Sequence, residues 1–430
     1  MSQPGEALMA DDPIEQDGNL EDPRGGQAPL GGQMGRIAAL GGLAFFIFAS
    51  YAIARPALKS LLITHYTADA LPIAWLGMAV AVTGTVMVYG RFAATIELTR
   101  LYRYVVVVCC VTLCLAMLLY QSGVTWAVFL LFIWKDVYIV VLAEMFWSIA
   151  NSLFALKTAK WIYGIFCAMG SLGGMSANFA IGPLAHELGT AHAPWLIIPI
   201  LLLSAGVVFS LPKVSPAQEE SRPQVDYTAG LRLVRDNRYL LCLLGIIAFI
   251  QIAINLVDYQ CSALVESNFA GADERTEVFG QIYGAIDIAA LVMQLSAGLI
   301  ITAIGVSGTL VGVPLILALC LIGFLVAPTF GVMAVAMVAG KSMDYSIFRA
   351  AKEMLYLPLS QAERTQGKAV IDMMTYRVAK GIASVAILGF AAWSAPIEAL
   401  AVVALVAVLG WLALTRILIP LYRDANGTHH

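Results

Sequence analysis

The sequence predicts an all-α polytopic membrane protein with twelve transmembrane helices arranged in two six-helix halves. Two observations carry this prediction. Of the 430 residues, 60% are hydrophobic and only 12% are charged, whereas soluble proteins average about 25% charged residues. The apolar residues are also gathered into runs of about 20 residues, which is the length that an α-helix needs to cross a bilayer.

The chain begins with a polar, acidic stretch at residues 1–35, which we expect to be a disordered tail rather than a signal peptide. A short C-terminal tail is expected at residues 421–430. Between the tails, the apolar runs predict transmembrane spans at residues 36–56, 71–90, 103–122, 126–152, 162–184, 194–212, 239–262, 278–301, 306–326, 329–349, 372–394 and 397–419.

A polar linker at residues 213–238 separates an N-terminal half (36–212) from a C-terminal half (239–420). Six plus six helices with a basic central loop is a major-facilitator-like architecture, which places its site at the midplane between the halves. Lysine and arginine gather in the loops on the side of the termini, whereas the opposite loops contain Arg275. By the positive-inside rule, we expect both termini and the linker to be cytoplasmic.

Charged side chains inside the spans are the candidate functional residues, because each costs about 2.5 kcal/mol or more at the bilayer centre. Arg55 and Lys59 lie four residues apart, on one face of the first helix. They form either an anion clamp or two anchors that reach the outer headgroups. Arg377 and Lys380 enter the eleventh span. With the first pair they contact an anionic substrate from both halves, or else they pair with Asp372 and lipid headgroups.

The fourth span carries Lys135, Asp136 and Glu144. Adjacent residues of a helix point about 100° apart, so we expect Lys135 and Asp136 to have different partners. These charges belong either to the substrate site or to a buried ion pair that holds helices together, since an unpaired buried charge is strongly destabilising.

The seventh span has a polar stripe, in which Gln251, Asn255, Asp258 and Ser262 recur at intervals of four, three and four residues. This spacing places them on one face, which is typical of a helix that lines an aqueous cavity. We predict that Asp258 is an essential cavity acid, which either pairs with a base or takes up a coupling proton.

Two further spans contain buried charges. Lys341 and Asp344 lie one helical turn apart in the tenth span, and Asp287 lies in the eighth. We expect Asp287 to pair with Lys341 or with Lys380. The glycine-rich segment at residues 170–174 indicates a close contact between helices rather than a phosphate-binding loop.

The stretch between Lys341 and Lys380 contains an ordered motif, made of Tyr345-Ser346, Lys352-Glu353-Met354, Tyr356, Pro358-Leu359, Lys368-Ala369, Ile371-Asp372, Arg377 and Lys380. It resembles the signature of the nucleotide transporter (ATP/ADP carrier) family of plastid and bacterial type, which is related to the major facilitator superfamily. Further matches to that family are Arg55 and Lys59, Glu144 with Phe146-Trp147 and Ala150-Asn151, and the run Asn255-Leu256-Val257-Asp258. The chain departs from the family at Ser60, where an acid is usual, and at Gln260-Cys261-Ser262, where a Trp-Lys pair is usual.

The resemblance implies a secondary transporter that moves ATP/ADP-like nucleotides, or a related phosphorylated anion, across a bacterial inner membrane by alternating access. Lys352, Glu353 and Asp372 then form a gate between the halves, the alternative being a solvated loop. The predicted substrate-binding residues are Arg55, Lys59, Lys135, Glu144, Asn151, Asn255, Asp258, Asp287, Lys341, Asp344, Arg377 and Lys380.

We find no nucleophile–base pair, zinc-ligand spacing or nucleic-acid motif, so the sequence predicts neither an enzyme nor a cofactor. The expected partners are an anionic small-molecule substrate, a coupling proton or a counter-substrate, and the lipid bilayer, with no nucleic acid and a monomeric state. Two alternatives remain open. One is a transporter of a different solute, either a non-nucleotide anion or a lipid, which the departures at 60 and 260–262 favour. The other is a non-transporting membrane receptor or scaffold.

Overall fold

The computed structural model describes residues 30–154, 156–215, 227–361, 363–371, 375–393 and 395–427. These residues are almost entirely helical, and no strand occurs among them. A helix satisfies its own backbone hydrogen bonds, which the interior of a bilayer requires because it offers no water. The predicted all-α class is confirmed.

The helices of the N-terminal half follow the apolar runs closely. They are α1 (Leu30–Tyr66), α2 (Ala70–Ala93), α3 (Leu98–Gln121), α4 (Ala127–Leu153), α5 (Leu156–Leu188) and α6 (Ile197–Val208), the last preceded by a short 3-10 helix, η1 (Ala193–Leu196). The chief difference from prediction is that α1 continues to Tyr66, past the expected end at residue 56. Arg55 and Lys59 therefore lie inside the helix instead of at its outer end.

The C-terminal half contains α8 (Arg238–Asn268), α9 (Ala272–Val326), α10 (Phe330–Met343), the π-helical turn η3 (Asp344–Phe348), α11 (Arg349–Leu355), the π-helical turn η4 (Glu363–Gly367), α12 (Thr375–Ala392) and α13 (Ile397–Gly427). The long α9 is two spans, because Gly305 adopts non-helical dihedral angles (φ 71°, ψ 168°) that only glycine adopts readily. This break separates the predicted spans 278–301 and 306–326.

The described helices account for the twelve predicted spans. Helices α1 to α6 give six, and α8, the two parts of α9, the rod formed by α10, η3 and α11, α12 and α13 give six more. Two segments expected to be polar and irregular are partly helical. The linker contains α7 (Tyr227–Asp236), with residues 216–226 outside the described part of the chain, and α13 continues to Gly427 through most of the predicted C-terminal tail.

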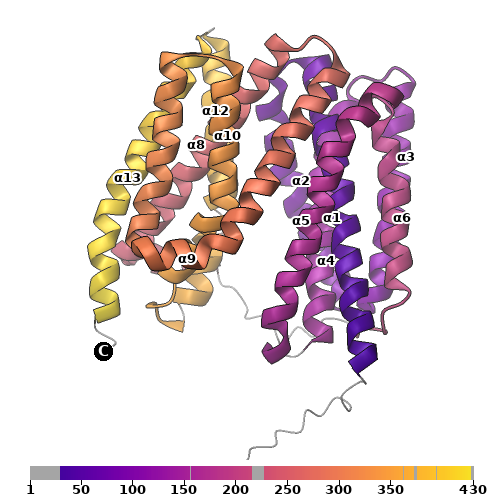
Figure 1. The fold of residues 1–430 in the computed structure, drawn as a ribbon, viewed down its shortest axis with the longest axis horizontal. Coiled ribbons are helices and arrows are strands. Elements are labelled where there is room, and N and C mark those ends of the chain that lie inside the picture. The colour runs from indigo at the N-terminus through magenta and orange to yellow at the C-terminus, as the bar shows by residue number, and fades with distance from the viewer. Residues whose placement is uncertain are drawn as a thin grey trace, which may run out of the picture.

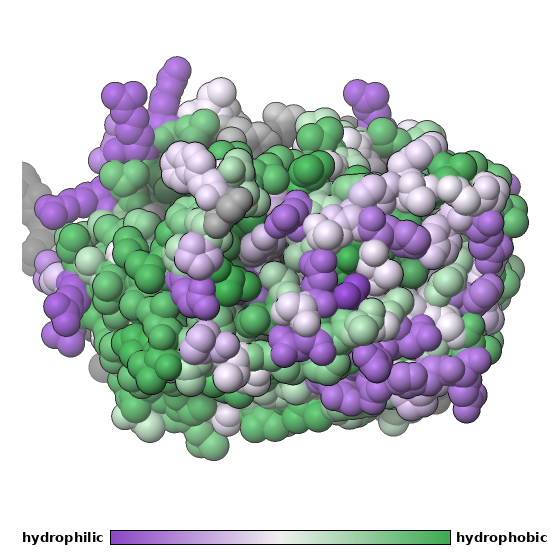
Figure 2. Space-filling view, turned by 90° about the horizontal axis from the view of Figure 1, so that it is seen from above, coloured by the Kyte–Doolittle hydropathy of each residue, from purple (hydrophilic) through white to green (hydrophobic). Residues whose placement is uncertain are grey.

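Figure 1 shows two helical bundles side by side, α1 to α6 in one and α8 to α13 in the other. Helix α1 begins and α13 ends at the same end of the molecule. The bundles meet through α5 and α9, through α1 and α9, and through α2 and α12. The opposite end, seen in Figure 2, has polar residues over its middle and hydrophobic residues along its flank.

Small residues allow the helices to approach closely. A Cβ atom added at Gly173 would lie 2.2 Å from the backbone oxygen of Phe45, and one added at Gly280 would lie 2.5 Å from that of Asn178. The first contact joins α5 to α1, and the second joins α9 to α5 across the two bundles. The predicted close helix contact at residues 170–174 is confirmed.

Candidate functional site

A cavity of about 410 Å³ lies between the two bundles, and both contribute to its wall. This volume is within the range of about 300–1,000 Å³ that is usual for small-molecule sites. Helices α1, α2 and α4 line one side, and α8, α9, α10, η3 and α12 line the other. Five of the lining residues are basic and three are acidic, an excess of two positive charges: Arg55, Lys59, Lys135, Lys341 and Lys380 against Asp136, Asp258 and Asp344.

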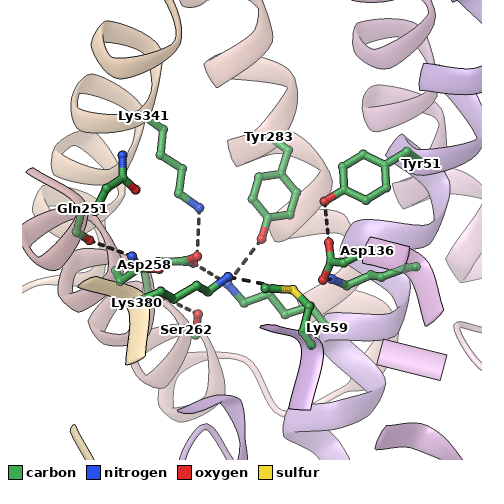
Figure 3. Close-up of polar contacts among 12 residues, drawn as sticks. Tyr51, Lys59, Asp136, Gln251, Asp258, Ser262, Tyr283, Lys341 and Lys380 are labelled. Atoms are coloured by element: carbon green, nitrogen blue, oxygen red, sulfur yellow. Dashed lines mark hydrogen bonds and ion pairs between the residues drawn. The ribbon is translucent and has the colours of Figure 1, made fainter. Parts of the chain in front are cut away.

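Asp258 of α8 joins two lysines at the centre of this cavity (Figure 3). Lys59 Nζ lies 2.6 Å from Asp258 Oδ1, and Lys341 Nζ lies 2.9 Å from Asp258 Oδ2. The Lys59 ammonium also donates to the hydroxyl of Tyr283 at 3.3 Å. Lys59 is buried and lies on α1, so its contact with Asp258 connects the two bundles. Because Lys59 lies in the cavity, the interpretation of this residue as an anchor that reaches the lipid headgroups is wrong.

A second charged pair lies wholly in the N-terminal half. Lys135 Nζ contacts Asp136 Oδ2 at 2.5 Å, and the Tyr51 hydroxyl donates to Asp136 Oδ1 at 2.9 Å (Figure 3). The expectation that Lys135 and Asp136 would have different partners was wrong. The long stem of a lysine lets its ammonium turn back to a neighbouring carboxylate, although their Cα–Cβ bonds diverge.

The two remaining bases of the cavity contact aromatic rings instead of carboxylates. The Arg55 guanidinium lies 3.6 Å from the centroid of the Tyr283 ring. The Lys380 ammonium lies 5.1 Å from the centroid of the Trp75 ring and 4.0 Å from the Met78 sulfur. Neither base forms an ion pair within 4.0 Å among the described residues. Cation–π contacts are weaker than ion pairs in such a setting, so these bases are the ones best placed to bind an anion.

The polar stripe of α8 faces the cavity as predicted for three of its four members. Gln251, Asn255 and Asp258 belong to the lining, and Gln251 Nε2 donates to Asp344 at 3.4 Å. Asn255 donates back to the Gln251 carbonyl at 2.7 Å. Ser262 is fully buried, outside the lining, and its hydroxyl bonds to the carbonyl oxygen of Asp258 at 2.5 Å.

Three other predicted substrate residues lie away from the cavity. Glu144 is exposed on α4, and Asn151 accepts a hydrogen bond from Tyr163. Asp287 contacts neither Lys341 nor Lys380, since its described hydrogen bond comes from Asn178 at 2.8 Å, so the expected pairing was wrong.

The predicted gate is only partly described. Glu353 pairs with Lys368 at 2.5 Å, within the C-terminal half, so this acid does not link the two halves as expected. Lys352 lies half-buried beside it on α11. Asp372 is outside the described residues. Arg377 belongs to α12, but its side chain is likewise outside the described part.

The two bundles are joined by hydrogen bonds at the end opposite the termini. Ser60 donates to the carbonyl oxygen of Ala272 at 2.6 Å, and Arg275 donates to the Thr64 hydroxyl at 3.1 Å. Asp273 accepts from the backbone amide of Thr190 at 2.6 Å. These contacts connect α1 and the turn after α5 to the start of α9, so they hold the bundles together at this end.

Aromatic residues of the lining were not predicted. Trp75, Tyr283 and Tyr345 all belong to the wall, and the first two stack with Lys380 and Arg55. Tyr345 belongs to the motif described above, but aromatic residues occur throughout apolar spans, so nothing in the sequence marks Trp75 or Tyr283 as cavity residues.

Comparison with known proteins gives two groups of relatives. The family described as TLC ATP/ADP transporter matches residues 195–339 and 324–422. The plastidic ATP/ADP-transporter of Solanum tuberosum is 26% identical over 322 residues, covering 64% of this chain and 50% of that protein. The ADP,ATP carrier protein 1 of Chlamydia muridarum is 26% identical over 292 residues, covering 56% of this chain and 54% of the carrier. The chain spans about half the length of these curated relatives.

Solved transporter structures share the fold. The nucleoside transporter NupG aligns with a TM-score of 0.66 at 13% identity, covering 88% of this chain and 98% of its own. A bacterial homologue of the iron transporter ferroportin, in its inward-facing state, gives the same TM-score and identity and covers 91% and 99%. The major-facilitator-like architecture predicted from the sequence is confirmed.

Proposed function

Because the chain belongs to the TLC ATP/ADP transporter family, we propose that it carries an ATP/ADP-like nucleotide, or a related phosphorylated anion, across a membrane by alternating access. The observation that carries this proposal is the cavity between the two halves, with five bases against three acids. A ligand at that place touches both halves. It can therefore favour one arrangement of the halves over another, which is the requirement for driving the motion.

Four of the five bases of the cavity fall into two classes with different roles, while Lys135 pairs with Asp136. Among the described residues, the contacts of Arg55 and Lys380 are with aromatic rings and a sulfur atom, so these two bases are ready to receive phosphate oxygens. An arginine holds two such oxygens at once, whereas a lysine acts as a point charge. Lys59 and Lys341 are held by Asp258 until an anion competes for them. The faces of Trp75 and Tyr283 provide apolar surface beside these bases.

Binding measurements on purified protein test this assignment. A thermal-shift screen with ATP, ADP, sugar phosphates and carboxylates identifies the ligand, because binding to the folded state raises its apparent stability. The Lys380→Gln and Arg55→Gln variants should then bind it about tenfold or more weakly, which corresponds to roughly 1.5–3 kcal/mol per charged hydrogen bond. Lys368→Gln is the matched control, since Lys368 pairs with Glu353 outside the cavity. Equal affinity in all three variants would place the site elsewhere.

For the setting of the protein, we propose an inner membrane with both termini and the linker 213–238 in the cytoplasm. The loop charges of the sequence support this orientation, as does the location of α1's start and α13's end at one end of the molecule (Figure 1). We propose that each chain forms one transporting unit, because its two halves together line the cavity. A reporter that works only in the cytoplasm should be active when it is fused after residue 220. Activity of a reporter that works only outside the membrane would contradict this topology.

A further inference from the structure

Asp287 of α9 is a carboxyl group within the membrane-spanning region that the substrate cavity does not include. It lies where α9 packs against α5 of the other half. Asn178 Nδ2 donates to Asp287 Oδ2 at 2.8 Å. A Cβ atom added at Gly174 would lie 3.1 Å from the same oxygen, so α5 comes unusually close to this carboxyl group. Within the described residues, no lysine, arginine or histidine forms an ion pair with it.

The amide partner of Asp287 is incompletely bonded. Asn178 is only 3% exposed, and its side-chain oxygen Oδ1 has no hydrogen-bond partner among the described groups. Leaving such a buried acceptor unbonded is costly. An ionised carboxylate cannot help, because it only accepts hydrogen bonds, whereas a protonated carboxyl group also offers an O–H. A carboxylic acid and an amide can form two reciprocal hydrogen bonds, in which the acid donates to the amide oxygen and the amide nitrogen donates to the acid.

The charges near Asp287 connect it to the cavity. Asn178 and Gly174 on α5 lie against this carboxyl group, and Arg55 on α1 and Tyr345 on η3 lie within electrostatic range of it. Arg55 stacks on Tyr283, one helical turn before Asp287, and lines the cavity wall. Because Arg55 lines the cavity and also stacks on the ring one helical turn before Asp287, its charge acts on both the cavity and the Asp287 carboxyl group.

We propose that Asp287 is a proton-binding site and that it shares Arg55 with the substrate anion. With a proton taken from water, Asp287 bonds to both polar atoms of the Asn178 amide, and the charge of Arg55 is available to an anion in the cavity. When the proton returns to water, the carboxylate attracts Arg55 and loses its bond to Asn178 Oδ1. Because linkage is reciprocal, the proton and the anion each strengthen the binding of the other. The proton site stands on the geometry alone, while its coupling to an anion rests on the transport function proposed above.

Infrared spectroscopy of the purified, substrate-free protein tests the proton site. The carbonyl band of a protonated carboxyl group should be present near neutral pH and should lose intensity in Asp287→Asn. In Asn178→Ala the band should change frequency, because the acid O–H loses the amide oxygen that accepts its hydrogen bond. Asp136→Asn is the control, since Asp136 already contacts Lys135 and Tyr51 as a carboxylate. Spectra of Asp287→Asn and Asn178→Ala that match the wild type would overturn the proposal.

Sodium ions are the rival occupant of this site, and the same preparation distinguishes them. Replacing choline chloride with sodium chloride should change neither the infrared band nor the thermal stability of the wild type. A rise in stability that depends on sodium and is absent in Asp287→Asn would show an alkali-cation site and contradict proton binding.

The coupling is tested by the pH dependence of ATP binding, measured on the wild type and Asp287→Asn at matched pH. The affinity of the wild type for ATP should increase more steeply than that of the variant as the pH falls. The difference in steepness can reach about tenfold per pH unit, which is the limit for one linked proton. Asp287→Asn should bind ATP without this excess, because its amide carries no titrating charge. Equal pH dependence in both proteins would overturn the coupling. An absence of ATP binding at every pH would instead refute the proposed nucleotide substrate, and the infrared result on Asp287 would stand independently.

Discussion

Replacing Asp258 with asparagine should destabilise the protein more than replacing either lysine that contacts it. Lys59 and Lys341 reach the two oxygens of this carboxylate at 2.6 Å and 2.9 Å, and their side chains are 4% and 7% exposed. Removing one partner of a buried pair costs about 3–5 kcal/mol, because the other charge is left uncompensated. Asp258→Asn leaves two such ammonium groups, whereas Lys341→Met leaves a carboxylate that still contacts Lys59.

We therefore expect the free energy of unfolding to fall by about 3–5 kcal/mol in Asp258→Asn and by only about 1.5–3 kcal/mol in Lys341→Met. The double variant Asp258→Asn/Lys341→Met should be more stable than Asp258→Asn alone, because one of the two unpaired lysines is gone. The assay is equilibrium unfolding of the purified protein in detergent micelles. An equal loss in Asp258→Asn and Lys341→Met, or no recovery in the double variant, would refute this account of the three residues.

Two further predictions concern the contacts between the halves. Gly280→Ala should lower the stability by about 1–3 kcal/mol, because its Cβ would lie 2.5 Å from the Asn178 carbonyl oxygen. Gly298→Ala should leave the stability unchanged, because the space around its Cβ is open. Equal unfolding midpoints for the Gly280→Ala and Gly298→Ala variants would contradict this prediction. Arg275→Gln removes charged hydrogen bonds at the end opposite the termini, so thiol labelling of a cysteine at the buried position of Ser60 should accelerate about tenfold or more. An unchanged labelling rate would show that other contacts keep that end closed.

The sequence was sufficient for the helices because each span is an apolar run of the required length. The main error in length, at α1, has a physical cause. Polar residues such as Ser60 and Thr64 lower the hydropathy after residue 56, but they form hydrogen bonds with the first turn of α9 instead of ending the helix. The hydropathy of a chain segment does not show which residues of another helix will form hydrogen bonds with its polar side chains.

The members of the site were easier to predict than their partners. Lys59, Asp258 and Lys341 were each recognised as costly charges inside spans, and each lines the cavity. Their contacts join residues 199 and 83 positions apart, which no local pattern reports. The pairing of Lys135 with Asp136 could not be predicted from helical geometry, because the direction of a Cα–Cβ bond says little about where the end of a long side chain lies.

Two of the polar links between the halves differ in chemistry. Lys59 of α1 contacts Asp258 of α8 through opposite charges, while Asn178 of α5 contacts Asp287 of α9 through an amide and a carboxyl group. An anion in the cavity competes with Asp258 for Lys59, so it weakens the first link. A proton adds a bond to the second link and so strengthens it. Since a ligand moves an equilibrium only by binding its states unequally, these two links are where substrate and proton would each act on the packing of the halves.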